Sequence, residues 1–257
     1  MWVTGSGMNQ ASRRASAANS TLIRLLIDLN VVEVEPCQTS FAERLGQFFD
    51  FSEAIRLSAV QTDALPSDNT APTRHPDLAS GSGITEEFLQ VRRTLISAIV
   101  KSCAPGSSDT YIRLPVLSLA ASIEMPGAYE PYHRFYLAHQ RDIAARVRHL
   151  RSSVRKNISG ASPALAQLTA LDATLDDILW ERTRKLFSTV PKLLQMRFEH
   201  LLNSHHQIES TQRIQPEQWI GQFCREMQML LLAELDVQLQ PVLGLIETFD
   251  KEANRNQ

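Results

Sequence analysis

Apolar residues recur every three or four positions through the second half of the chain, a spacing that places them on one face of a helix. Three such segments follow one another, at about 131–158, from 162 to 202, and from 216 to 249. Gly160 is the one glycine between residues 128 and 220, and it lies between the first two segments. Together these features predict a three-helix antiparallel bundle over 128–251, with a coiled-coil-like hairpin that turns at Gly160.

Prolines are expected to mark the ends and interruptions of these helices. Pro163 follows Ser162 and is expected at the first helical position, where its missing N–H leaves no hydrogen bond unmade. Pro191 lies inside the second apolar stripe and is expected to bend that helix. Pro241 is expected to kink the last turns of the third helix, which should begin at Pro216 and Glu217.

The first part of the chain predicts a small N-terminal helical unit over 20–61, preceded by a disordered leader at 1–19. A short amphipathic helix is expected from Ser20. A second is expected from Phe41, because Ser40 and Glu43 have the spacing of a capping box. The same apolar pattern continues to residue 60, with a break expected around 50–52. The predicted fold class is therefore all-α: a long antiparallel bundle with a small helical unit before it.

A polar connection joins the two parts. Residues 62–84 contain five prolines and glycines among Ser, Thr, Asp and Asn, and they predict a flexible linker. The segment 85–127 should open with a helix from Thr85 that stops before Pro105. Within it, 111–125 is compatible with a strand or a buried helix, and we assign it as helix because an isolated strand would have no partner. Residues 252–257 are expected to form a tail.

Composition restricts the location and the global chemistry of the protein. The chain has 257 residues, is 43% hydrophobic and carries a formal charge of −2, so it has enough apolar material for a core and no global basic field. Its three cysteines have no metal-binding or disulfide spacing, which is typical of a reducing compartment. We expect neither an export signal nor a membrane span, because charged residues interrupt every apolar run. A cytoplasmic location is therefore predicted.

Charge is distributed unevenly across the predicted hairpin. Seven cationic side chains against the single Asp142 give residues 131–156 a local charge of +6, whereas 164–181 hold four acidic side chains and no Lys or Arg. If the turn is centred on Gly160, Arg148 lies near Asp172, and residues 141–144 lie near 176–177. We therefore expect intramolecular pairing that fixes register, with nucleic acid or another acidic protein as alternative partners of the basic helix. The basic residues are Arg134, Arg141, Arg146, Arg148, Arg151, Arg155 and Lys156, and the acidic ones are Asp172, Asp176, Asp177 and Glu181.

No set of catalytic, cofactor-binding or metal-ligating residues emerges from the sequence. The aspartates of 172–177 resemble a magnesium-binding helix, but no second acidic motif faces them. His200, His205 and His206 lack the i, i+4 spacing of a helical metal pair and are interpreted as a polar helix end. Phosphate-binding glycine loops and the G-x-S-x-G motif are also missing. The aromatic cluster at 129–136 could stack bases, but core packing is the favoured interpretation, and Trp180 and Trp219 are expected to anchor helices to one another.

Several segments, taken in order, resemble a bacterial family designated domain of unknown function 3348. They are Leu22–Leu26, Ser40–Leu45, Ala54–Ser58, Tyr132–Gln140, Ser162–Leu168 and Leu231–Asp236. The resemblance covers about 20–249, with the leader and the linker outside it, and it implies no catalytic residues. Genes of this family often lie beside genes for OmpA-like proteins and for proton-channel proteins similar to the MotA, TolQ and ExbB class. This neighbourhood implies a soluble accessory to a cell-envelope motor complex.

These observations predict a non-enzymatic scaffold or adaptor without cofactor or metal. It would present helix surfaces to another protein, such as envelope motor or proton-channel components, and it could also form a homo-oligomer. The alternative is a nucleic-acid-binding helical protein that uses the basic helix 131–156. This alternative is less favoured, because the acidic residues of 164–181 are expected to pair with the basic helix within the chain.

Overall fold

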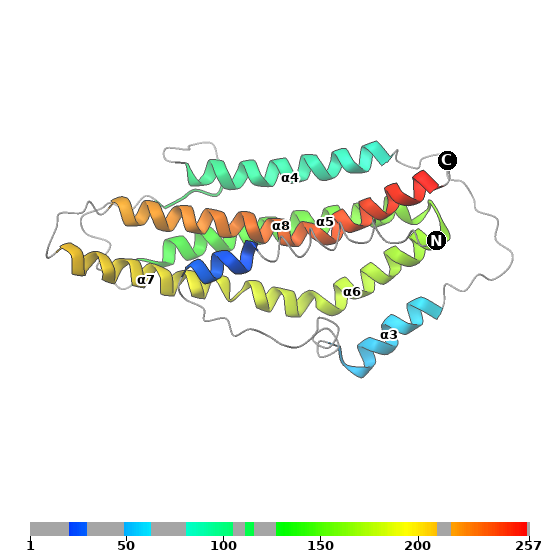
Figure 1. The fold of residues 1–257 in the computed structure, drawn as a ribbon, viewed down its shortest axis with the longest axis horizontal. Coiled ribbons are helices and arrows are strands. Elements are labelled where there is room, and N and C mark those ends of the chain that lie inside the picture. The colour runs from blue at the N-terminus through cyan, green and yellow to red at the C-terminus, as the bar shows by residue number, and fades with distance from the viewer. Residues whose placement is uncertain are drawn as a thin grey trace, which may run out of the picture. The chain divides into compact units, whose positions relative to one another are not determined.

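The computed structural model describes residues 21–29, 49–62, 81–104, 111–115, 127–209 and 217–255. This part of the chain is all-α and contains no strand, which confirms the predicted fold class (Figure 1). Residues 21–28 are helical, as expected from the pattern after Ser20. The longer helices are α3 (Phe51–Thr62), α4 (Gly81–Cys103), α5 (Glu130–Ser159), α6 (Pro163–Phe187), α7 (Val190–Glu209) and α8 (Glu217–Arg255).

The chain divides into two compact units that are not consecutive segments, unlike the predicted domains. Unit 1 takes the described residues of Met1–Glu33, Leu89–Arg148 and Phe187–Pro241. Unit 2 takes those of Val34–Phe88, His149–Leu186 and Val242–Gln257. Helices α4, α5 and α8 each contribute residues to both units, so the division falls inside helices rather than at the predicted linker.

The turn between α5 and α6 forms where the sequence predicts it. Helix α5 ends at Ser159, Gly160 and Ala161 form the turn, and α6 begins at Pro163. Ser162 caps the new helix, because its Oγ accepts the Leu165 N–H at 3.2 Å, as Ser side chains commonly do at this position. This bond satisfies one N–H group of the first turn, and Pro163 has no N–H group that would need a partner. Both features favour a helix start at this position.

The second predicted arm is two helices rather than one bent helix. Helix α6 ends at Phe187, a turn follows at Ser188 and Thr189, and α7 begins at Val190. The expected bend at Pro191 is therefore wrong: this proline is the second residue of α7, where no intrahelical partner awaits its missing N–H. The Thr189 carbonyl accepts the N–H groups of the next residues, Lys192 at 3.0 Å and Leu193 at 3.1 Å.

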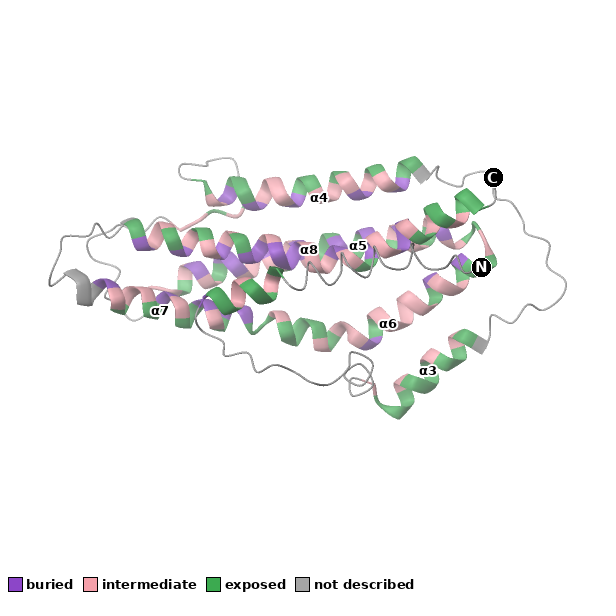
Figure 2. Cartoon of the chain, in the orientation of Figure 1, coloured by how far each residue is buried: buried purple, intermediate pink, exposed green. Residues whose placement is uncertain are grey.

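Buried residues lie along α5, α7 and α8 (Figure 2), and in unit 1 several of them are aromatic. Phe198 packs edge-on against Phe223 at 5.2 Å between ring centroids and against Trp219 at the same distance. Tyr132 approaches Phe223 edge-on at 5.5 Å. These geometries are favourable for aromatic pairs, and each ring removes a large apolar area from water. The predictions of a core role for the 129–136 aromatics and of Trp219 as an anchor are confirmed.

Helix α8 carries the predicted apolar stripe. Buried residues recur at intervals of three and four from Trp219 to Leu230 and from Leu235 to Leu245, as the sequence indicated, and the stretch 230–235 between them is buried at five of its six positions. The helix continues through Pro241 to Arg255, so residues 252–255 are helical rather than a tail. By length and composition α8 could also cross a membrane, but half of its apolar window is buried inside the protein. Its buried positions are Trp219, Phe223, Met227, Leu230, Leu231, Ala233, Glu234, Leu235, Leu239, Val242, Leu245 and Ile246.

Unit 2 begins with α3, whose first turn has a capping box that the sequence analysis did not assign. The Asp50 carboxylate accepts the Glu53 N–H at 2.7 Å, while the Glu53 carboxylate accepts the Asp50 N–H at 2.9 Å. Glu53 also pairs with Arg182 of α6 at 2.9 Å. The expected break around 50–52 is therefore a helix start.

Two further boundaries differ from the predictions. Helix α4 begins at Gly81, so the end of the expected linker 62–84 is helical, and Ile84 is 1% exposed because it faces the core. Its end at Cys103, before Pro105, is as predicted. Residues 111–115 are not helical, contrary to our assignment. The leader 1–19, the expected helix from Phe41, most of the expected linker and residues 116–125 lie outside the described residues.

Candidate functional site

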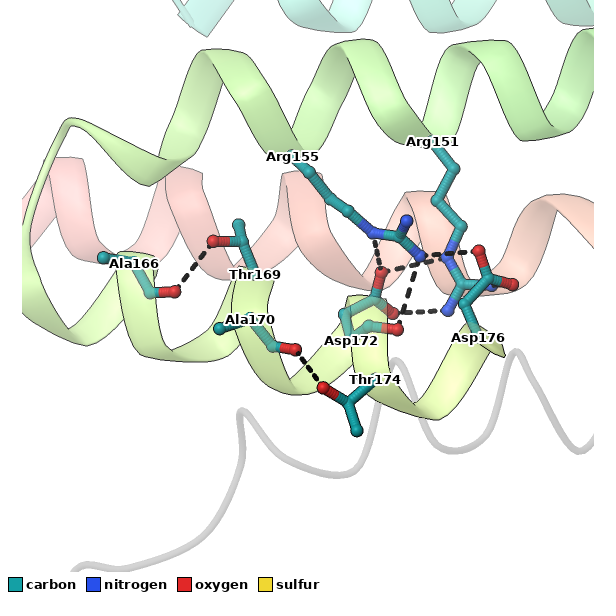
Figure 3. Close-up of polar contacts among 8 residues, drawn as sticks. All are labelled: Arg151, Arg155, Ala166, Thr169, Ala170, Asp172, Thr174 and Asp176. Carbon is teal, nitrogen blue, oxygen red and sulfur yellow. Dashed lines mark hydrogen bonds and ion pairs between the residues drawn. The ribbon is translucent and has the colours of Figure 1, made fainter. Parts of the chain in front are cut away.

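Two arginines of α5 and two aspartates of α6 form a four-member ion-pair network (Figure 3). The Arg151 Nε donates to Asp172 Oδ2 at 2.9 Å, and its Nη1 donates to Asp176 Oδ1 at 2.6 Å. The Arg155 Nε donates to Asp172 Oδ2 at 2.6 Å, and its Nη2 donates to Asp176 Oδ2 at 2.8 Å. Each cation thus contacts both carboxylates, a geometry for which the guanidinium fork is well suited.

The network forms because both pairs have i, i+4 spacing. Residues four apart project from the same side of a helix, so 151 and 155 face 172 and 176 together. The four side chains are only 13–22% exposed, so the pairs are less screened than surface pairs. Burial alone would lower the pKa of Arg155, but its hydrogen bonds to Asp176 and Asp172 outweigh burial and raise that pKa above its ordinary value.

The observed register corrects the predicted one. We expected Arg148 beside Asp172 and residues 141–144 beside 176–177, whereas the pairs are formed by Arg151 and Arg155. The turn is centred at residue 161 rather than 160, which brings Arg151 nearly level with Asp172. Helical side chains also point toward the N-terminus of their own helix, so Arg155 reaches back along α5 to the same carboxylate. The structure thus has the expected ion pairs between α5 and α6, but they are formed by other arginines than the predicted ones.

The other basic residues of α5 are more exposed than Arg151 and Arg155. Arg134 contacts Glu130 at 3.3 Å, and Arg146 binds Asp142 at 2.8 Å, both within α5. Arg141, Arg148 and Lys156 are exposed. Helix α5 therefore keeps further cationic side chains at the surface, and one of them, Arg148, lies seven residues before Arg155 on nearly the same side of the helix.

The remaining acidic residues of the predicted set do not join the network. Asp177 is exposed on α6, and Glu181 pairs with Arg184 at 3.3 Å, where both side chains are about 70% exposed. An exposed pair of this kind contributes little to stability, so the structural part of the predicted acidic set is Asp172 and Asp176.

A buried carboxylate in unit 1 is the most prominent polar feature that the sequence analysis missed. Glu234 of α8 is fully buried and accepts the Tyr136 O–H at 2.8 Å. The Gln140 Nε2 lies 3.0 and 2.9 Å from the two Glu234 oxygens and also donates to the Phe187 carbonyl at 3.1 Å. Burial raises the pKa of Glu234 to about 7, although the bonds from Gln140 and Tyr136 act in the opposite direction.

A second buried polar pair joins α4 to α5. The His139 Nε2 and the Ser102 Oγ are 2.8 Å apart, and both residues are 2% exposed. Ser102 Oγ also donates to the Ile99 carbonyl at 2.9 Å, so the imidazole Nε2 donates to the hydroxyl. Burial lowers the pKa of His139 to about 4, because the charged imidazolium would be desolvated.

The thiols and the other histidines of the described segments offer no reactive set. Burial raises the pKa of Cys103 to about 11 and that of Cys224 to about 12, which keeps both thiols protonated at neutral pH. Cys37 lies outside the described residues. Within them, no group of three or more His, Cys, Asp or Glu side chains is placed to hold a metal ion. His205 is 8% exposed beside Trp219, so the expected polar helix end is wrong at this position.

Comparison with known proteins identifies the family. The family model described as Protein of unknown function (DUF3348) matches residues 8–251. The chain belongs to this family. The match includes most of the leader and the linker, which the resemblance had left outside. No curated protein and no solved structure shows a significant match.

For this DUF3348 member, the burial of Glu234 could have been predicted from helix spacing alone. Glu234 stands three positions after Leu231 and seven after Met227, both of which are buried. A carboxylate at these offsets falls on the apolar stripe of α8, so the same periodicity that predicted the core also placed this charge inside it. Tyr136 and Gln140 lie four apart on the facing side of α5, which lets both reach the same carboxylate.

Proposed function

We propose that this protein is a non-enzymatic helical scaffold or adaptor that binds another protein through exposed helix surfaces. The observation that supports the proposal is that α5 has exposed arginines besides the two that form ion pairs with α6. Arg151 and Arg155 bind α6, whereas Arg134, Arg141 and Arg148 are exposed. The fold therefore uses two arginines of α5 for interhelical ion pairs and leaves further arginine side chains exposed, and arginine is enriched at protein interfaces.

The family resemblance suggests where such a scaffold would act. We propose that the partner belongs to a cell-envelope proton-channel complex of the MotA, TolQ and ExbB class, reached from the cytoplasm. Self-association into a homo-oligomer is compatible with this role. The neighbourhood of family genes supports this part of the proposal, and the arginines of α5 would then contact a cytoplasmic segment of the complex.

Nucleic-acid binding by α5 is the second candidate function. The local charge of +6 over 131–156 favours it, because each neutralised phosphate releases counterions and strengthens binding at low salt. Two of those seven cations are engaged by Asp172 and Asp176, which reduces the charge that α5 presents to a polyanion.

Affinity purification after crosslinking in the native cell tests the proposal. The tagged full chain and its Arg141→Glu variant would be purified in parallel, and mixed-sequence DNA and RNA would be tested in gel shifts. A defined protein recovered with the wild type and depleted at least tenfold with the variant supports the scaffold. Recovery of no protein, together with a salt-dependent shift of DNA or RNA, would replace it with the second candidate.

A further inference from the structure

One glutamine of α5 joins the buried Glu234 to the end of α6. The Gln140 Nε2 lies 3.0 and 2.9 Å from the two Glu234 oxygens and 3.1 Å from the carbonyl oxygen of Phe187, the last residue of α6. All three residues belong to unit 1. An amide nitrogen carries two N–H groups, so one can donate to Glu234 while the other donates to Phe187. The carboxylate therefore holds, through a single amide, a carbonyl at the junction between α6 and α7.

The junction itself lies at the surface. Residues 183–189, which end α6 and turn toward α7, include no buried residue. Beyond the turn, the Tyr129 O–H donates to the Pro191 carbonyl at 2.5 Å. Helix α5 thus contacts the junction on both sides of the turn. Of these two contacts, the one at Phe187 shares its donor, the Gln140 amide, with a carboxyl group.

The hydrogen bonds of Glu234 fit its ionised form. An ionised carboxylate only accepts hydrogen bonds, and Tyr136 and Gln140 both donate to it. These bonds lower the pKa of Glu234, although burial outweighs them and raises it to about 7. Linkage is reciprocal, so a proton on Glu234 weakens the same bonds by the same free energy. Both forms are populated near neutral pH, and the ionised one matches the observed arrangement.

Protonation changes what the carboxyl group of Glu234 requires. The acid form has an O–H group that needs an acceptor inside the core. Tyr136 already donates to Glu234 Oε1, so the adjoining acceptor is the amide oxygen of Gln140, once the amide has made a half turn. That oxygen would then stand beside the Phe187 carbonyl, and two acceptors without a hydrogen between them repel each other. The carbonyl would turn toward water, which is close because Ser188 and Thr189 are exposed.

We propose that Glu234 is a proton switch for the α6–α7 junction. With Glu234 ionised, Gln140 donates to Phe187 and the junction is closed. With Glu234 protonated, the Gln140 amide is reversed and the junction opens. The proton comes from water and returns to water, and apart from the O–H bond of the acid only hydrogen bonds form and break. The switch does not depend on the proposed scaffold function, because no partner protein takes part in it.

The other ionisable groups around Glu234 are accounted for. Burial and the charge of Glu234 raise the pKa of Tyr136 well above its ordinary value, so its O–H stays protonated. Burial lowers the pKa of His139, on the same helix, to about 4, so its ring is neutral at pH 7. The charged groups that other elements bring to this region are Arg92 of α4, which pairs with Asp236 at 3.3 Å, and the exposed Lys185 of α6 and Lys192 of α7. A response centred near pH 7 is therefore expected from Glu234.

Hydrogen exchange of the full chain tests the switch. Peptides covering 183–193 would be followed by mass spectrometry at pH 6 and pH 8, with each rate divided by the intrinsic rate at that pH. We expect opening to be about tenfold more frequent at pH 6, because the protonated fraction of Glu234 is about nine tenths there and about one tenth at pH 8. Ionised Glu234 destabilises the fold as a whole, so global unfolding should be rarer at pH 6 and cannot account for faster exchange.

Two variants and one control make the test specific. Glu234→Gln supplies a neutral amide that can donate to the reversed Gln140, and it should keep the junction open at both pH values. Gln140→Leu removes the link and should also open the junction independently of pH, while Tyr136 still binds Glu234. Asp236→Asn removes a carboxylate from the same helix and should keep the wild-type response.

Three results would overturn the proton switch. They are wild-type opening that is the same at pH 6 and pH 8, opening that is more frequent at pH 8, and a pH response that persists in Glu234→Gln. The wild type alone decides the first two, so the test holds even where a variant fails to fold.

Discussion

Arg155 binds Asp172 at two places, the carboxylate and the main-chain carbonyl. Its Nε donates to Oδ2 at 2.6 Å, and its Nη2 donates to the Asp172 carbonyl oxygen at 3.3 Å. Through the second contact the arginine binds the backbone of α6 as well as a side chain. A slip of α5 along α6 by one turn, about 5.4 Å, would break both, so this residue pair helps to fix the register of the hairpin.

The Asp172→Asn substitution should destabilise the hairpin. Asp172 accepts from two guanidinium groups, and the amide removes a charge from a network that is 13–22% exposed. We expect a loss of about 2 kcal/mol in the free energy of unfolding, measured by urea denaturation. Asp177→Asn, on the same helix but exposed, is the control and should change stability by less than about 0.5 kcal/mol. Equal effects of the two substitutions would mean that the network is not structural.

The cap of α3 gives a second, local prediction. Asp50→Ala removes the acceptor of the Glu53 N–H and should destabilise the start of α3, with faster hydrogen exchange confined to that helix. Asp50→Ser keeps an oxygen at the cap and should retain most of the protection. Unchanged exchange in the alanine variant would show that the Glu53–Arg182 pair alone holds this helix end.

Glu234 should make the protein less stable as the pH rises. Its pKa is about 7 when folded and 4.5 ordinarily, so between these values the folded state binds more protons than the unfolded state. Stability is then fully present below about pH 4.5 and is lost as the pH rises through 7, by about 3 kcal/mol. Glu234→Gln keeps an acceptor for Tyr136 without the charge, and should remove the decline measured by urea denaturation between pH 5 and pH 8.

The control for this prediction is Glu199→Gln, which neutralises an exposed carboxylate on α7. That variant should retain the wild-type decline. An identical decline in Glu234→Gln would show that Glu234 does not titrate in this range.

His139 should make the protein less stable as the pH falls, which is the opposite of the effect of Glu234. Its pKa falls from the ordinary 6.5 to about 4 on folding, so its contribution is present above pH 6.5 and is lost as the pH falls through 4. His139→Gln should reduce the acid sensitivity of the thermal midpoint, whereas His200→Gln, at an exposed position on α7, should not. Between about pH 4.5 and 6.5 the effects of His139 and Glu234 on stability oppose each other. The stability of the wild type should therefore change little with pH in this range, whereas that of either single variant should change with pH.

Local signals explain which helix boundaries could be predicted. Gly160, Ser162 and Pro163 punctuate the α5–α6 turn, and the observed boundaries lie within one or two residues of the expected ones. The α6–α7 break was missed because the apolar stripe continues in phase on both sides of it and Pro191 sits in the first turn of the new helix. Periodicity reports which side of a helix is buried, and it does not report whether the helix is continuous.

The sequence predicted that the charged residues of α5 and α6 form ion pairs, but it did not predict which residues form them. Opposite charges on consecutive helices predicted that α5 and α6 would pair, but the identity of the pairs depends on the reach of arginine and on the direction in which helical side chains point. The contacts of Glu234 with Tyr136 and Gln140 join residues more than 90 positions apart in the chain. Such contacts depend on the packing of α8 against α5, which sequence spacing alone does not determine.

The central claim is that α5 divides its arginines between folding and binding. Once the partner is identified by crosslinking, the thermal midpoints of wild type, Arg151→Gln and Arg141→Gln, each with and without partner, test it most directly. Arg151→Gln should lower the midpoint of the protein alone and keep the increase caused by the partner. Arg141→Gln should leave the midpoint alone unchanged and lose that increase. The reverse pattern, or the same behaviour of both variants, would contradict the division of roles along α5.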